Sequence, residues 1–121
     1  MKTEKNDLLI NLINLSVANK KTFGYNYRPK SDKFSYPQDR LSISFNVEQL
    51  TDEDKLDVLL FVLKHKVCGA NGTPSLEKGF NNIDYVDFYE IDDMSLEALN
   101  DLVLLSEKIN KSTFFYEYFG M

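Results

Sequence analysis

The chain has 121 residues, a formal net charge of −5 and a single cysteine, Cys68. This length fits one domain over residues 1–121, a hydrophobic content of 43% excludes a disordered chain, and a lone cysteine excludes an internal disulfide. No apolar run approaches the ~20 residues of a membrane span. Glu4 and Asp7 lie where a signal peptide would be basic. We therefore expect a cytoplasmic protein with no membrane partner.

Hydrophobic periodicity predicts a small α+β domain in the order α-β-β-α-β-α. The expected elements are a helix over 6–19, strands over 22–27 and 41–47, a helix over 51–67, a strand over 83–91 and a helix over 95–110. Leu8, Leu12 and Leu15 recur at helical spacing, whereas residues 41–47 alternate apolar and polar side chains. One face of that strand is polar and therefore solvent-exposed, which implies antiparallel pairing. Its expected neighbour is the strand over 22–27, which precedes it across a turn-rich loop. The sequence thus predicts a mostly antiparallel sheet with helices packed on one face.

The helix over 51–67 carries more apolar residues than one stripe needs. Its start is marked by Thr51, whose side chain can accept a hydrogen bond from an otherwise unpaired backbone amide of the first turn. The expected core stripe is Leu56, Leu59, Leu60, Leu63 and Val67. Three further residues widen this stripe: Val58, Phe61 and Val62. Either the helix is central and covered on both sides, or these three residues lie near a contact between copies. We expect a homodimer or higher oligomer.

The C-terminal part of the chain is expected to complete the sheet and the helix layer. The strand over 83–91 has aromatic residues on both faces, which predicts a central position in the sheet. Ser95 is the expected cap of the last helix. Its predicted inward residues are Leu96, Leu99, Leu102, Val103, Leu105 and Ile109. Residues 113–119 have β composition, which favours a terminal strand over a longer helix.

Charge is distributed unevenly along the chain. Residues 1–40 hold eight Lys or Arg and four Asp or Glu, whereas residues 41–121 hold six and fifteen. Such an uneven distribution of charge influences which partners a protein attracts and not which fold it adopts. An acidic–aromatic face is expected from Asp84, Tyr85, Asp87, Tyr89, Glu90, Asp92 and Asp93. Acids among tyrosines suit docking on the basic, nucleic-acid-binding surface of another protein.

The basic first third of the chain supports an alternative, a nucleotide- or RNA-binding module using residues 20–40. Its candidate ligand-binding residues are Tyr25, Tyr27, Arg28, Lys30, Lys33 and Arg40. Cations can contact phosphates while flat rings stack on bases. However, the rings can equally be core residues and the lysines solvated loop charges. The overall charge of −5 also argues against general nucleic-acid affinity.

The sequence offers no convincing catalytic or metal site. His65 and Cys68 are three residues apart, but both lie at an expected helix C-terminus, where the negative potential disfavours a thiolate. A structural cysteine is the simpler interpretation. One histidine and one cysteine also exclude a zinc site of the usual kind. We therefore expect no catalytic residue, no metal and no cofactor.

These observations favour a non-enzymatic protein that acts by stoichiometric contact with a basic protein partner. An inhibitor or immunity-type protein, directed against a nucleic-acid-handling or defence protein, fits the size and the charge. Only two of the fourteen basic residues are arginine, a bias typical of AT-rich genomes. That bias agrees with an anti-defence protein encoded by a phage or another mobile element.

Overall fold

The computed structural model describes residues 2–28, 40–66 and 74–119, with side chains over 4–27, 41–66 and 74–112. Its elements are α1 (Lys2–Ala18), β1 (Phe23–Arg28), β2 (Arg40–Asn46), the 3₁₀ turn η1 (Val47–Gln49), α2 (Asp52–His65), β3 (Tyr85–Phe88), the 3₁₀ turn η2 (Ile91–Asp93) and α3 (Leu96–Phe119). This order confirms the predicted α+β fold class. Lys30, Lys33 and Cys68 lie outside the described residues.

The three strands form one antiparallel sheet in the order β1-β2-β3. Phe23 lies opposite Phe45 of β2, which lies opposite Val86 of β3. The predicted pairing of the first two strands is confirmed, but the prediction of a central third strand is wrong, because β2 is central. The aromatic residues on both faces of β3 were misleading. Phe88 is fully buried against the helices, whereas Tyr85 on the other face is 52% exposed.

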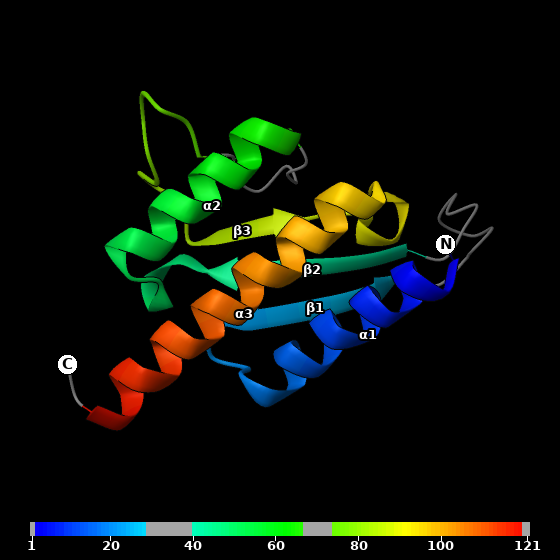
Figure 1. The fold of residues 1–121 in the computed structure, drawn as a ribbon. Coiled ribbons are helices and arrows are strands. Elements are labelled where there is room, and N and C mark those ends of the chain that lie inside the picture. The colour runs from blue at the N-terminus through cyan, green and yellow to red at the C-terminus, as the bar shows by residue number, and fades with distance from the viewer. Residues whose placement is uncertain (1, 29–39, 67–73, 120–121) are drawn as a thin grey trace.

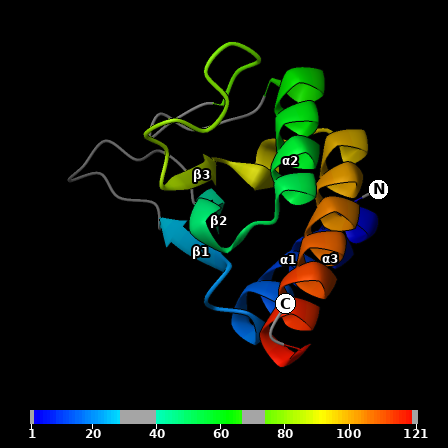
Figure 2. The same ribbon diagram turned by 90° about the vertical axis from the view of Figure 1, so that its left-hand side faces the viewer.

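All three helices cover the same face of the sheet, as predicted, and leave the other face without a helix (Figure 2). In this layer α3 lies between α1 and α2 (Figure 1). The core below it is aromatic: the ring of Phe45 lies 5.3 Å from the rings of Phe23 and Phe88, and Phe61 of α2 lies 5.4 Å from Phe88. Each such edge-to-face contact adds about 0.5–1.5 kcal/mol to the burial of apolar area.

α2 is rotated relative to the predicted core stripe. The three residues expected near an oligomer contact are buried, with exposures of 0, 6 and 4%: Val58, Phe61 and Val62. Three of the expected core residues are instead 53, 52 and 40% exposed: Leu56, Leu60 and Leu63. The sequence predictions for both sets are therefore corrected. Periodicity shows that α2 has two apolar faces, but the packing of the helix decides which face meets the sheet.

The helix caps follow the sequence, whereas the last segment does not. Thr51 Oγ1 accepts a hydrogen bond from the Asp54 amide, and Ser95 Oγ accepts one from the Ala98 amide, both at 3.1 Å. α3 continues through 113–119, so the predicted terminal strand is wrong. β composition is a weak preference, and each residue added to an existing helix gains a hydrogen bond without a new nucleation cost.

Candidate partner-binding groove

The predicted acidic–aromatic face is divided between two parts of the molecule. Tyr85 and Asp87 lie on β3, opposite Asn46 and Ser44 of β2, on the sheet face that the helices leave uncovered. The chain then turns at Glu90, whose backbone is left-handed with φ 53°, and enters η2. Because η2 packs against α1 and β2, its two aspartates lie at a different part of the surface.

Asp92 has a structural role in this turn. Its Oδ1 accepts a hydrogen bond from the Leu41 amide at 3.0 Å, and its carbonyl oxygen accepts one from Lys5 Nζ at 3.3 Å. These contacts attach η2 to β2 and α1. The remaining members of the predicted face are exposed: Asp84, Tyr89, Glu90 and Asp93.

A groove of about 590 Å³ opens between the N-terminal halves of α1 and α3. The two helices run in the same direction, so their first turns lie at the same end of the molecule (Figure 1). The groove is lined by Glu4, Asp7 and Leu8 of α1 and by Leu96, Glu97 and Asn100 of α3. Leu96, predicted to point inward, is 38% exposed there. Two partly exposed leucines thus lie among three exposed carboxylates.

The three groove carboxylates differ in what they already contact. Glu4 and Glu97 lie in the first turns of their helices, where negative charge stabilises the positive helix end. Glu97 also lies 3.6 Å from Lys64 of α2. Within the described part of the chain, neither Glu4 nor Asp7 forms an ion pair. Their charges therefore remain available to a basic ligand.

His65 forms a contact between two helices. Its Nε2 lies 2.8 Å from Asp101 Oδ2, and Lys64 Nζ lies 3.0 Å from the same oxygen. These hydrogen bonds, with His65 the larger influence, lower the pKa of Asp101 below its ordinary value. Cys68 lies outside the described residues, so its predicted role stays a prediction. Over 2–28, 40–66 and 74–119, no three histidine, cysteine or acidic side chains gather as a metal site would require.

The described part of the basic–aromatic segment lies along β1 and the start of β2. Tyr25 and Tyr27 are 48 and 49% exposed, on the same side of the sheet as buried Phe23. Phe23 belongs to the core, so two tyrosines remain of the three rings in the described part of this segment. The strand register places Arg28 directly opposite Arg40.

A smaller cavity, of about 110 Å³, opens beside the start of β1. Its main lining residues are Lys20, Lys21, Gly24, Ser44, Asn46 and Tyr85. A Cβ atom at Gly24 would lie 3.0 Å from Ser44 Oγ, so the glycine permits this close approach. Two lysines beside small polar groups and one ring fit a small anion. Neither lysine was among the predicted ligand-binding residues.

Comparison with known proteins places the chain in no family: no protein-family model, curated protein or solved structure matches it. No helix within the described ranges is both long and apolar enough to cross a membrane. The functional argument therefore depends on the geometry and charge of the surfaces themselves.

Sequence reasoning missed Glu4 and Asp7 as site residues. Their spacing with Leu8 places all three on one side of a helix, which is a detectable signal. However, the same pattern occurs in any solvated helix with acids near its start. Only the packing of α1 beside α3 brings it next to Leu96 and Glu97.

Proposed function

We propose that this protein acts without catalysis, by stoichiometric contact with a basic segment of another protein that binds in the groove between α1 and α3. The observation that carries this proposal is the combination, in one groove, of two partly exposed leucines and three exposed carboxylates. A segment with an apolar anchor flanked by Lys or Arg side chains complements it. The protein would then be an inhibitor or immunity-type protein, and its target a nucleic-acid-handling or defence protein.

The surroundings of the groove support the same partner chemistry. Glu90 and Asp93 are exposed in and beside the turn that leads into α3. Complementary charge mainly accelerates association and selects the partner, while buried apolar anchors determine how long the complex lasts. Stable interfaces use about 20–30 residues on each partner, which is more than the groove and its lining residues supply. The partner is therefore expected to contact the adjoining acidic turn as well.

The proposal can be tested with a synthetic amphipathic peptide of lysine and leucine as the probe. The variant Glu4→Gln, Asp7→Asn, Glu97→Gln should bind this peptide about tenfold more weakly, because three favourable charge contacts are lost. The matched control removes the same charges elsewhere: Glu48→Gln, Asp52→Asn, Glu77→Gln. These three acids are also exposed. Isothermal titration calorimetry measures both affinities.

NMR chemical-shift mapping with the same peptide locates the bound surface. The largest shifts are expected at Leu8, Leu96 and Asn100, which line the groove. Equal loss of affinity in both triple variants would show that the peptide responds only to net charge. That result, or shifts confined to the sheet, would contradict binding in the groove.

A second candidate function, binding of a nucleotide or RNA, is favoured by the small cavity beside β1. Lys20 and Lys21 supply positive charge there, and the ring of Tyr85 is 52% exposed and able to stack. The cavity of about 110 Å³ admits a phosphate-sized group, so bases would have to lie on the exposed sheet surface. Asp87 lies opposite Ser44 on the same face of the sheet. Its negative charge would repel a phosphate, which weakens this candidate.

A single-stranded RNA oligonucleotide tests this second candidate. The variant Lys20→Ser, Lys21→Ser should weaken binding and reduce its salt dependence, whereas Lys78→Ser, Lys111→Ser should leave both unchanged. The substitutions Arg28→Ser, Lys30→Ser and Lys33→Ser test the originally predicted residues in the same assay. An RNA that fails to bind at low salt excludes the candidate.

A further inference from the structure

α2 exposes a row of leucines on the side away from the sheet. Leu56, Leu60 and Leu63 are 53, 52 and 40% exposed, at helical spacings that place them on one face. This exposure is not a consequence of poor packing, because the opposite face of α2 buries Val58 and Phe61 in the core. α2 also lies at the border of the helix layer, with α3 on one side only (Figure 1).

The exposed charges of α2 lie at its two ends, whereas the half-buried Lys55 and Asp57 lie between them. Asp52 and Glu53 are exposed in the first turn, whereas Lys64 and Lys66 are exposed at the other end. Asp52 lies four residues before Leu56, and Lys66 lies three residues after Leu63. The exposed leucines therefore have a negative residue at one end of their row and a positive residue at the other.

We infer that a second copy of this chain covers the leucine row, with the two α2 helices packed antiparallel about a twofold axis near Leu60. This arrangement places Leu56 opposite Leu63 of the partner subunit. It also places Asp52 opposite Lys66 of the partner subunit, and the symmetry repeats both contacts. The acidic start of each helix meets the basic end of the other. Because the helices are antiparallel, their dipoles also attract each other.

A second copy fits this face better than an unrelated partner because one helix supplies both complementary ends. A partner with uniform charge would satisfy one end of α2 and be repelled by the other. The predicted homodimer is thus retained, but its contact residues change from the buried Val58, Phe61 and Val62 to the exposed leucines. The groove lies between α1 and α3, and its one contact with α2 within the described residues is the ion pair between Glu97 and Lys64.

The dimer is testable by analytical ultracentrifugation of the full chain, over concentrations up to about 1 mM. Wild type should show a concentration-dependent dimer, and Leu60→Glu should remain monomeric, because symmetry brings two such charges together at the axis. Ile10→Glu is the matched control, since Ile10 is 54% exposed in the middle of α1. This control should dimerise like wild type. Circular dichroism checks that both variants keep the fold.

A charge exchange separates specific antiparallel packing from general apolar association. Asp52→Lys and Lys66→Glu should each weaken the dimer, since each creates like-charge pairs at both ends. The double variant Asp52→Lys, Lys66→Glu should restore it, although both changes oppose the helix dipole and lower monomer stability. A wild-type protein that stays monomeric at the highest concentration, or a double variant weaker than either single variant, would overturn the inference.

Discussion

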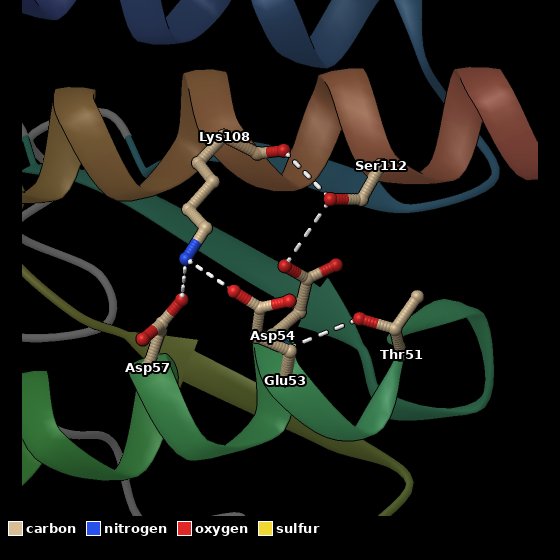
Figure 3. A network of polar contacts seen from close by, with 6 residues as sticks. All are labelled: Thr51, Glu53, Asp54, Asp57, Lys108 and Ser112. Atoms are coloured by element: carbon tan, nitrogen blue, oxygen red, sulfur yellow. Dashed lines mark hydrogen bonds and ion pairs between the residues drawn. The ribbon is translucent and has the colours of Figure 1, made fainter.

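At the scale of single residues, Asp54 is the least satisfied group in the described structure. Its side chain is 1% exposed, and Oδ2 has no hydrogen-bond partner among the described residues. Oδ1 lies 3.4 Å from Ser112 Oγ, which donates to the Lys108 carbonyl oxygen at 3.1 Å (Figure 3). A hydroxyl has one proton, so it cannot donate to both. A protonated Asp54 would donate to Ser112 and complete the chain of hydrogen bonds.

Burial raises the pKa of Asp54 above its ordinary value of 3.8, although hydrogen bonds with Thr51 and Ser112 and the charge of Lys108 oppose the change. The folded protein therefore binds this proton more tightly than the unfolded chain does. The stability gained from protonated Asp54 is complete below pH 3.8 and is lost as the pH rises through the folded-state pKa.

Asp54→Asn should therefore raise the free energy of unfolding at pH 7, by about 1 kcal/mol, the order of the cost of an unsatisfied buried polar group. Urea unfolding at several pH values should show this difference shrinking towards pH 4. Asp52→Asn is the control: it removes an exposed acid from the same turn and should cost a few tenths of a kcal/mol. Lower stability of Asp54→Asn at pH 7 would mean that the ionised carboxylate has a partner.

At the scale of elements, the packing of α2 on α3 has polar contacts at both ends. His65 and Lys64 bond to Asp101 at one end. Lys108 bonds to Glu53 and Asp57 at the other (Figure 3). Exposed ion pairs add little free energy, so the burial of Phe61 and Val62 mainly sets the rotation of α2. In this rotation Phe61 lies in the core, and its sequence neighbour Leu60 is exposed.

The rotation of α2 predicts a large effect for one substitution and a small effect for its neighbour. Phe61→Ala should lower the free energy of unfolding by about 3–5 kcal/mol, because it empties part of the core beside Phe88. Leu60→Ala should change it by about 0.5 kcal/mol or less when measured in dilute, monomeric solution. Chemical denaturation measures both. Similar losses for the two variants would contradict the observed orientation.

At the scale of the whole molecule, one hydrophobic core joins all the helices and strands. Its buried members include Leu12 of α1, Phe45 of β2, Val58 of α2 and Leu102 of α3. Such a shared core has no boundary at which half of the chain could unfold by itself. The charge polarity of the sequence lies on the surface around this core and does not divide it.

A single cooperative unfolding transition is therefore expected. Far-UV circular dichroism, which reports the helices, and tyrosine fluorescence, to which Tyr25 and Tyr27 of β1 and Tyr85 of β3 contribute, should give the same midpoint in urea. The variant Phe45→Ala should shift both midpoints together, since its ring contacts Phe23 and Phe88. Two separate midpoints would indicate two folding units instead of one.

The sequence by itself determined the element order, the first strand pairing and the helix caps. The helix caps and the alternation within strands depend on residues close together in the chain, and the two paired strands follow one another along it. Thr51 and Ser95 cap helices through amides three residues away, and the alternation in β2 identifies its wet face. Capping residues and hydrophobic periodicity can be recognised within a single segment of the sequence, so the α+β fold class could be predicted.

Only the tertiary structure decided which apolar face of α2 is buried, that β3 lies at the edge of the sheet, and that α1 and α3 together form a groove. Each of these outcomes depends on bringing together residues far apart in the chain, such as Leu8 and Leu96, which line the same groove. The free energy of such contacts comes from area buried against a particular neighbour. A sequence shows which residues can be buried, whereas packing selects the ones that are.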